Sequence, residues 1–406
     1  MIDVARIDGP FVLLDGGGAT ARLYRDPVRI ITAFDLSEVQ PAMEQISRAG
    51  AAGMHAAGYL TYEAGIAFED RLGGLAGACR RRAPLLWFGL FRAPERVPAR
   101  AIGTGISPVS IGTPRPRISR AQYGSRFAAA QDLIRSGDIY QVNLTFPCLV
   151  SLTGHPLALY AAVRAQAGAR HGGIVRTGNH WTLSFSPELF FALEGGVMTC
   201  RPMKGTAARR ADPAEDARVA AALATDPKQR AENLMIVDLL RNDMARLARP
   251  GSVGVDRLFE VETYPTIHQL TSTISATMID GLTPDALFRA IYPCGSITGA
   301  PKIRAMEIIA ALEQEPRGIY TGAIGAIAPG GDASFNVAIR TLEMKEGEDF
   351  GRIGLGSGVV ADSQVDEEWQ ECLTKARFLS GLRSADMRMP RRPRTRFTGP
   401  QLYGPV

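Results

Sequence analysis

The chain has 406 residues, enough for two domains or one large two-layer fold, and 46% of them are apolar, as in a globular protein. Its net charge of +5 comes from residues 383–396, which hold six arginines and one aspartate, while the rest carries equal numbers of bases and acids; this argues against a nucleic-acid-binding domain. No apolar run reaches the roughly 18 to 20 residues of a membrane span, and the N-terminus lacks a signal-like apolar block, so we expect a cytoplasmic protein with no membrane partner.

The first hundred residues mix strands and helices without a βαβ rhythm. The sequence FVLLDGGG (11–18) predicts a strand that ends in a glycine turn, and residues 36–48 predict a helix. Residues 92–118 are rich in Pro, Gly and Ser, which break any periodicity and mark a connection. We therefore expect three parts, which are an N-terminal subdomain at 1–110, a main domain at 119–382 and a basic, disordered tail at 383–406.

In the main domain the predicted strands come in blocks. The strand at 139–150 places Val142, Leu144 and Phe146 on one face, opposite Asn143 and Thr145. Further strands are predicted at 181–193, 197–203, 319–328, 333–345 and 352–361, and helices at 119–136, 227–247, 283–291, 301–313 and 366–382. Strands in blocks favour mixed α+β layers and argue against a doubly wound parallel sheet.

The last predicted helix opens with an acidic cluster. Asp366 is expected to be its N-cap. At about 100° per residue, Glu368, Glu371 and Lys375 share one face of the helix. This face has two interpretations. It is a solvated surface with a Glu371–Lys375 pair, or it offers two carboxylates to a hard cation such as Mg²⁺.

The helix at 227–247 is apolar on nearly all sides, so it is expected to be buried and its charges need partners. Asp238 and Arg241 can pair with each other at i,i+3. Glu232 is therefore the candidate metal ligand, facing the other acidic helix. Histidine and cysteine offer no alternative site, since the chain has neither an HExxH nor a CxxC pattern.

Two residues are candidates for acid and base chemistry. Lys204 follows a strand and precedes a glycine in RPMKGT; it is either an exposed strand-end residue or, in a partly desolvated pocket, a nucleophile or general base. Glu188 lies in SFSPELFF among Phe185, Phe190 and Phe191. Apolar surroundings favour a carboxylic acid that keeps its proton for general acid work, and the alternative is an ordinary surface acid.

Two glycine-rich stretches do not predict nucleotide sites. The stretch GSITGAPK (295–302) lacks the GK[ST] ending of a P-loop. In GLGSGVVA (354–361) a GxGxxA pattern precedes a helix, but no second parallel strand follows to complete a dinucleotide fold. We interpret this stretch as a bend whose backbone NH groups hold a carboxylate. Arg340 on a neighbouring strand either adds bidentate carboxylate binding or forms a salt bridge.

Taken together, these segments resemble the chorismate-binding enzyme family, most closely its aminodeoxychorismate-forming branch. The matching stretches follow family order and are GDIYQVNLT (137–145), SPELF (186–190), RPMKGT (201–206), AENLMIVDLLRND (231–243), HQLTSTI (268–274), GSITGAPKIRAMEII (295–309), GIYTGAIG (318–325), SFNVAIRT (334–341) and GSGVVADS (356–363). So many ordered matches are far more specific than any single glycine pattern. The implied fold is like that of anthranilate synthase component I, an α+β fold in which β-sheets pack as a sandwich with flanking helices.

The resemblance also implies an activity, the amination of chorismate at C4 to 4-amino-4-deoxychorismate, a precursor of p-aminobenzoate and folate. Lys204 is implied to add to C2 as the C4 hydroxyl leaves, and Glu188 to protonate that hydroxyl. Mg²⁺ is implied to bridge the ring carboxylate of chorismate and three helix carboxylates, those of Glu232, Glu368 and Glu371. The implied substrate-binding residues are Thr206, His268, Thr298, Tyr320, Arg340, Gly356, Gly358 and Lys375.

Alternatives within and outside the family remain. The resemblance implies that anthranilate synthases typically lack the lysine matching Lys204, whereas isochorismate and salicylate synthases keep it as a base for water. No cysteine lies in the GxCxG turn of a glutaminase, so ammonia is expected from a glutamine amidotransferase partner. Two departures are Cys294, where the family usually has glycine, and LLDG (13–16), where anthranilate synthases carry LLES. The non-enzyme alternative is nucleic-acid binding through the basic tail.

Overall fold

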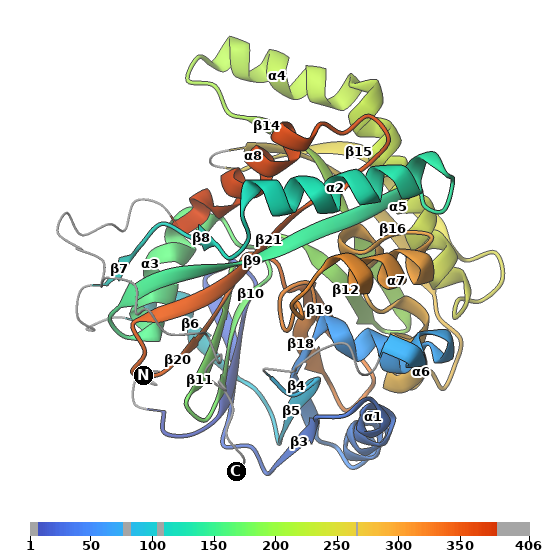
Figure 1. The fold of residues 1–406 in the computed structure, drawn as a ribbon. Helices are drawn as coiled ribbons and strands as arrows, with labels where there is room; N and C mark the ends of the chain where they lie inside the picture. Colours follow the sequence, from blue (N-terminus) through green and yellow to red (C-terminus); the bar gives the residue numbers. More distant parts are fainter. Residues whose placement is uncertain (1–6, 76–82, 104–108, 265–266, 380–406) are drawn as a thin grey trace.

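The computed structural model describes residues 7–75, 83–103, 109–264 and 267–379, so the predicted basic tail lies outside the described residues. Two large antiparallel β-sheets share one hydrophobic core, and helices cover them (Figure 1). The predicted α+β class with layered sheets is therefore confirmed. Among the described residues, no helix combines the length and the apolar character that a bilayer crossing requires.

Sheet A contains the strands that carry the later glycine-rich stretch. In spatial order its strands are β17 (Gly299–Ala300), β9 (Gln141–Thr153), β21 (Phe350–Val359), β20 (Thr341–Lys345), β11 (His180–Ser184), β10 (Gly172–Thr177), β1 (Phe11–Asp15), β2 (Thr20–Arg25) and β6 (Glu95–Pro98), while β7 (Ser110–Ile111) and β8 (Arg115–Pro116) also pair with β9. On β9, Val142, Leu144 and Phe146 are fully or almost fully buried, as their alternation predicts.

Sheet B contains the strand of Lys204. Its spatial order is β14 (Met203–Ala208), β16 (Ile267–Thr277), β13 (Val197–Arg201), β12 (Leu189–Glu194), β19 (Ala333–Val337), β18 (Ala323–Ile327), β4 (His55–Leu60), β5 (Leu86–Phe91) and β3 (Arg29–Ala33), and β15 (Gly254–Thr263) also pairs with β16. Strands from the first hundred residues thus complete both sheets. The division into subdomains stays a prediction.

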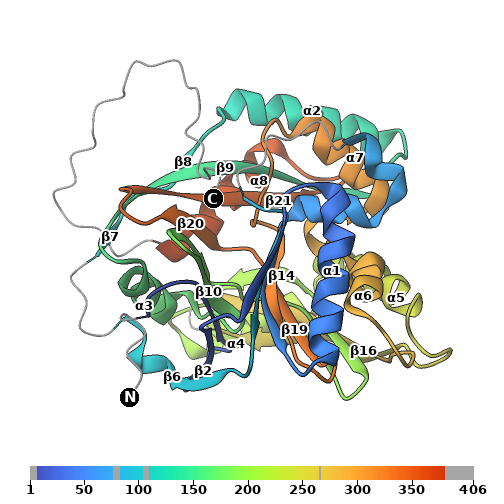
Figure 2. The same cartoon turned by 90° about the horizontal axis from the view of Figure 1, so that it is seen from below.

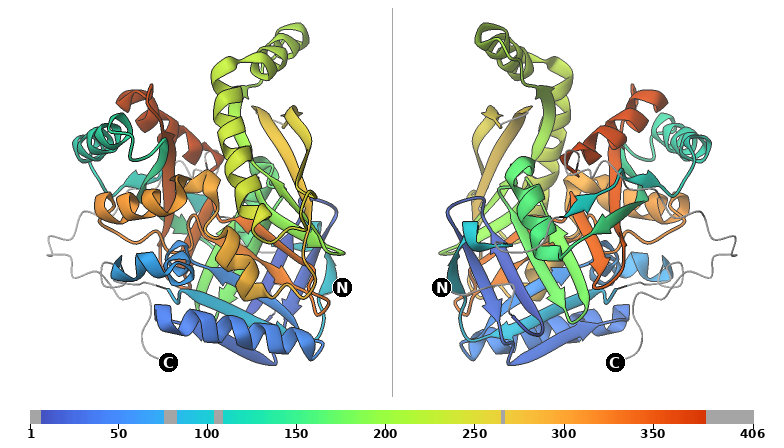
Figure 3. Two further views of the ribbon diagram at one scale, coloured as in Figure 1. Left: turned by 90° about the vertical axis from the view of Figure 1, so that its right-hand side faces the viewer. Right: turned by 90° about the vertical axis from the view of Figure 1, so that its left-hand side faces the viewer.

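Eight α-helices lie among the described residues. They are α1 (Leu36–Ala51), α2 (Arg120–Arg135), α3 (Pro156–Ala167), α4 (Pro213–Thr225), α5 (Pro227–Ala245), α6 (Pro284–Ile291), α7 (Lys302–Leu312) and α8 (Val365–Lys375). The starts of α4, α5 and α6 follow from local sequence, because Asp212, Asp226 and Thr283 accept a backbone hydrogen bond and proline comes next. Helices α1, α5 and α6 line one side of the molecule (Figure 2), and α4 projects beyond β14 and β15 (Figure 3).

Three predicted elements differ from the structure. The strands predicted at 181–193 and at 333–345 are each two strands in different sheets, β11 with β12 and β19 with β20, so Glu188 and Arg340 lie between strands. The stretch 354–361 is not a bend, because Gly356 and Gly358 lie within β21 and pair with Thr145 and Asn143 of β9. Long-range pairing with a neighbouring strand overrides the local glycine preference for turns.

Two helix predictions also need correction. Helix α8 begins at Val365 with Gln364 as its N-cap, while Asp366 instead forms an ion pair of 2.5 Å with Arg120 of α2. Helix α5 is not buried on all sides, since Leu234 is 42% exposed. The predicted pair of Asp238 and Arg241 is present at 2.9 Å on the exposed face of α5.

Candidate active site

Two segments that connect sheet A with sheet B lie side by side, and each contains a predicted site residue. Strand β11 pairs with β20 in sheet A, whereas β12 pairs with β19 in sheet B. The segments that connect them contain Glu188 and Arg340, and they are joined by backbone hydrogen bonds from Phe185 N to Arg340 O (3.0 Å) and from Val337 N to Glu188 O (3.2 Å). Arg340 has a φ of +48°, a conformation that non-glycine residues rarely adopt. The paired crossings therefore hold both residues between the sheets.

Lys204 lies in a β-bulge. Strand β14 pairs with β16 at Met203 and again at Thr206 with a shift of register in between, and Gly205 has a φ of +94°. A bulge with glycine in this conformation re-aims the neighbouring side chain. The Lys204 amine consequently reaches β21 of the other sheet, where a Cβ built on Gly358 would lie 2.9 Å from Nζ.

Glu188 is a buried acid beside this lysine. It is 5% exposed, and its Oε1 accepts a hydrogen bond of 2.8 Å from Ser296 Oγ. Burial raises the pKa of Glu188 to about 7, against the opposing effects of the Ser296 hydrogen bond and of Lys204 and Lys375. A carboxyl group with this pKa is available as a proton donor near neutral pH.

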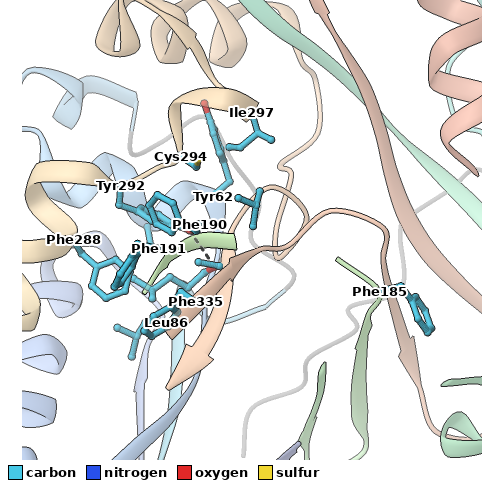
Figure 4. Packing of buried hydrophobic residues seen from close by; sticks show 14 of the residues in the cluster. Tyr62, Leu86, Phe185, Phe190, Phe191, Phe288, Tyr292, Cys294, Ile297 and Phe335 are labelled. Atoms are coloured by element: carbon cyan, nitrogen blue, oxygen red, sulfur yellow. Dashed lines mark hydrogen bonds between the residues drawn. The ribbon is translucent and has the colours of Figure 1, made fainter. Parts of the chain in front are cut away.

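The aromatic surroundings predicted for Glu188 are not gathered as the sequence indicated. Phe190 and Phe191 belong to a cluster around Phe335, where the rings of Phe191 and Phe335 stack at 5.4 Å. Phe185 lies apart from this cluster (Figure 4) and stacks on Tyr160 at 5.1 Å. The prediction that the pKa of Glu188 is raised is supported. The cause is burial at the sheet crossing and not a surrounding cluster of the three phenylalanines.

Helix α8 brings a second lysine and an acid to β21. The Lys375 amine donates to Gly356 O and to Glu371 Oε1, each at 2.8 Å. Burial favours the neutral form of Glu371, but Lys375, Lys204 and Lys228 outweigh it and lower the pKa of its carboxyl group. The predicted pair of Glu371 and Lys375 is thus formed, and it lies at the site.

The three predicted metal ligands come from two facing helices. Glu232 of α5 lies 3.3 Å from Lys204 Nζ, and Glu368 of α8 accepts a hydrogen bond of 2.7 Å from Ser363 Oγ. Both carboxylates act on Lys228. Asp362 raises the pKa of the Lys228 amine most, and Glu232 and Glu368 raise it further. No group of three metal-ligating side chains is close enough to share an ion within the part of the chain that the structure describes. The donor chemistry nevertheless fits Mg²⁺, which prefers carboxylate oxygens together with water and substrate oxygens.

His268, a predicted substrate-binding residue, has protein partners of its own. His268 is buried, with Nε2 2.9 Å from Asp216 and Nδ1 3.0 Å from Thr263. A backbone hydrogen bond from Arg210, followed by those of His268 and Arg209, lowers the pKa of Asp216 to about 2. Both ring nitrogens of His268 are thus engaged, and the histidine connects α4 to β16.

The hydroxyl of Thr206 donates to Gln269 Oε1 at 2.9 Å and is exposed. The hydroxyl of Thr298 donates to Cys294 O at 2.8 Å and is buried. Neither hydroxyl therefore donates a hydrogen bond to the Lys204 amine. Their predicted roles in substrate binding stay predictions.

Tyr320 lies against β21 of sheet A, and Arg340 lies at the sheet crossing. The ring of Tyr320 packs on Gly354, where a Cβ would lie 2.0 Å from it, and it lines a pocket that holds neither Lys204 nor Glu188. Arg340 forms no ion pair with a described residue, so the salt bridge that the sequence left open is not found there. Burial lowers the pKa of Arg340, and Tyr264 has a smaller effect in the opposite direction.

Sequence reasoning missed two residues of this site. Gln141 is fully buried, neither its side-chain nitrogen nor its oxygen has a partner among the described residues, and its Nε2 would lie 3.3 Å from a Cβ on Gly358. Ser296 donates a hydrogen bond to the Glu188 carboxyl group. Both lie in stretches that the resemblance singled out, 137–145 and 295–309, but only the tertiary structure shows their partners.

The chain is similar in sequence to several known proteins. A profile described as chorismate binding enzyme matches residues 104–381. Aminodeoxychorismate synthase component 1 of Salmonella typhimurium is 41% identical over 289 residues, 71% of this chain and 61% of that protein. Anthranilate synthase component 1 of Streptomyces coelicolor is 38% identical over 307 residues, 73% of this chain and 60% of that protein. This chain therefore spans about 60% of the length of these curated relatives.

The crystal structure of anthranilate synthase component I from Streptococcus pneumoniae matches with a TM-score of 0.76 at 25% identity, covering 93% of this chain and 94% of that chain. The predicted fold, like that of anthranilate synthase component I, is confirmed by this match. Because the family profile covers well over half of the residues in sequence and the fold agrees, the chain belongs to the chorismate-binding enzyme family.

Proposed function

We propose that this protein aminates chorismate at C4 and forms 4-amino-4-deoxychorismate. One observation carries the proposal: the Lys204 amine and the buried Glu188 carboxyl share one site, and the pKa of Glu188 is raised to about 7. The 41% identity to a protein named aminodeoxychorismate synthase component 1 supports the same reaction. Relatives named anthranilate synthase component 1 reach 39% identity, but the family resemblance implies that those enzymes typically lack a lysine that matches Lys204.

The reaction needs a nucleophile and an acid on the substrate ring. The neutral Lys204 amine forms a bond to C2, the ring double bonds shift, and the C4–O bond breaks as Glu188 donates its proton, so that water leaves. Ammonia then bonds to C4, the double bonds shift back, and the C2–N bond to Lys204 breaks. The proton released by the new amino group returns Glu188 to its acid form, so that chorismate and ammonia become aminodeoxychorismate and water.

The remaining residues bind and orient the substrate in this proposal. Glu232, Glu368 and Glu371 would hold Mg²⁺, which when bound neutralises a substrate carboxylate. Arg340, which has no described ion-pair partner, suits a second carboxylate, and Lys375 with Gly356 forms a neighbouring donor surface. Before the substrate binds, Glu371 lies 2.8 Å from Lys375 Nζ and Glu232 lies 3.3 Å from Lys204 Nζ.

The proposed source of ammonia is a glutamine amidotransferase partner. Some of the relatives that match are named component 1 of a synthase, which supports a second component for this chain. The partner is tested by measuring whether glutamine replaces ammonium as the nitrogen donor only when a candidate amidotransferase is added.

The direct test is incubation of the purified protein with chorismate, Mg²⁺ and ammonium, with products separated by mass and retention. Aminodeoxychorismate is the expected product, and anthranilate, isochorismate or salicylate as the main product would overturn the assignment. The Lys204→Ala variant should form none of the C4 amine, while Lys345→Ala, which removes a lysine from β20 instead, should retain activity. A fully active Lys204→Ala protein rules out the covalent route.

A further inference from the structure

A cysteine lies beside the predicted acid. Cys294 occupies a position at which the family usually has glycine, it is 4% exposed, and it lies close to Tyr292 at the edge of the aromatic cluster (Figure 4). The Cys294 thiol sulfur lies 3.2 Å from Ser296 Oγ, and the same hydroxyl donates to Glu188 Oε1 at 2.8 Å. Two hydrogen bonds therefore connect the thiol to the Glu188 carboxyl group through one serine.

The turn that carries Cys294 and Ser296 has a fixed shape. It is closed by hydrogen bonds from Thr298 Oγ1 to Cys294 O at 2.8 Å and from Thr298 N to Gly295 O at 3.2 Å. A Cβ built on Gly295 would lie 1.9 Å from the Leu239 side chain, so the turn packs directly against α5. The thiol and the serine hydroxyl therefore have defined positions relative to each other.

The direction of the two hydrogen bonds follows from the number of hydrogens. A serine hydroxyl carries one hydrogen and accepts through its lone pairs. Because Ser296 donates its hydrogen to Glu188, its oxygen is the acceptor in the contact with Cys294, and the thiol is the donor. Burial, together with the nearby Glu188 carboxylate, raises the pKa of the Cys294 thiol to about 12, so the thiol keeps its hydrogen near neutral pH.

Titratable groups from neighbouring elements also act on the acid and the thiol, and they are Lys204 of β14, Lys375 of α8, Cys200 of β13 and Lys302 of α7. The two lysines beside Glu188 lower the pKa of its carboxyl group, and the Ser296 hydrogen bond has a larger effect in the same direction. A change in that hydrogen bond should therefore appear in the pKa of Glu188.

A donor to the serine changes how the serine binds the acid. Hydrogen bonds in a chain polarise one another, so a hydroxyl that accepts a hydrogen bond is a better donor. With the thiol in place, the Ser296 hydrogen is directed to Glu188 Oε1. The transferable proton of the acid then lies on the other carboxyl oxygen, Oε2. Without the thiol, the hydroxyl can rotate and accept the proton of Oε1 instead.

We infer that Cys294 is a positioning residue for the acid: its thiol directs the Ser296 hydroxyl to Glu188 Oε1 and keeps the transferable proton on Oε2. The importance of this role for turnover rests on the proposed function, in which Glu188 protonates the leaving hydroxyl. The hydrogen bonds themselves form without substrate, so the effect of the thiol on the acid is measurable separately from the reaction.

The test measures the pKa of Glu188 in the full chain without substrate, from the carbon-13 NMR shift of its carboxyl carbon in glutamate-labelled protein, with Glu188→Gln for the assignment. Cys294→Ala should raise this pKa by about half a unit, because it weakens one hydrogen bond to the carboxylate. Cys294→Ser keeps a donor and should restore the wild-type value. Cys148→Ala removes another buried thiol, from β9, and is the matched control that should change nothing.

A second background and a rate measurement complete the test. In Ser296→Ala protein, Cys294→Ala should cause no further change, since the connection is already broken. With chorismate and ammonium, the alkaline limb of the pH–rate profile should move upward in Cys294→Ala and return in Cys294→Ser. If Cys294→Ala fails to fold, Cys294→Gly, with the residue that the family usually has, gives the same comparison.

Two results would overturn the inference. One is a Glu188 pKa that Cys294→Ala leaves unchanged or lowers. The other is a change that persists in the Ser296→Ala background, which would show that the thiol acts by another route. A raised Glu188 pKa in a protein that forms no aminodeoxychorismate would refute the proposed function alone and support the connection between thiol and acid.

Discussion

The charge state of Glu188 should be measurable in the stability of the protein. The variant Glu188→Gln keeps the shape of the side chain and an oxygen that accepts the hydrogen bond of Ser296, but it cannot ionise. Below pH 4.5 the wild-type residue is protonated in the folded and the unfolded chain alike, so the pH dependence of the two proteins should be parallel there.

The difference develops as pH rises through the window between the two pKa values. The ordinary pKa of 4.5 applies to the unfolded chain, and burial raises the pKa of the folded one to about 7. Between these values the unfolded chain has released its proton while the folded protein still holds it, so wild type loses stability with rising pH. The full difference corresponds to about 3 kcal/mol, reached above pH 7 and favouring the variant.

The assay is urea unfolding of both proteins from pH 4.5 to 8.5, without ligands and with EDTA. The free energy of unfolding of Glu188→Gln minus that of wild type should rise by about 3 kcal/mol across this range. Glu194→Gln, an exposed position at the end of the same strand, is the control and should show no such rise. Parallel pH profiles for wild type and Glu188→Gln would refute a raised pKa.

Three further predictions concern the site and its support. Gly358→Ala places a Cβ 2.9 Å from the Lys204 amine, so turnover with chorismate and ammonium should fall at least tenfold while the melting temperature changes by a few degrees only; unchanged turnover would contradict the contact. Ser296→Ala removes a hydrogen bond that lowers the pKa of Glu188, so the alkaline limb of the pH–rate profile should move upward; a downward shift would argue against it. Lys302→Ala removes the amine that lies 2.5 Å from the buried Asp243. The variant should lose about 3 kcal/mol of unfolding free energy, measured in urea, and a loss below about 1 kcal/mol would show that water replaces the lysine.

Local sequence signals predicted six of the eight α-helices among the described residues, but they missed α3, α4 and more than half of the strands, among them β10, β15 and β16. The helices at 227–247 and 283–291 begin at capping residues followed by proline, and such signals act within one turn of the chain. The same kind of reasoning failed at Asp366, because its ion pair with Arg120 joins residues far apart in sequence. The interpretation of 354–361 as a bend was also wrong, although the strand predicted at 352–361 is confirmed, because Gly356 and Gly358 lie in β21 and pair with β9.

The sequence by itself determined the family, through ordered motifs, and it determined which residue types are present for the proposed chemistry, notably Lys204 and Glu188. Only the tertiary structure decided how they meet. A bulge at Gly205 aims Lys204 across to the other sheet, and a crossing between sheets buries Glu188 beside Ser296. Strand register, bulges and burial depend on contacts between distant parts of the chain, so they cannot be derived from a local pattern. The raised pKa of Glu188 and the unpaired side-chain amide of Gln141 both follow from those contacts.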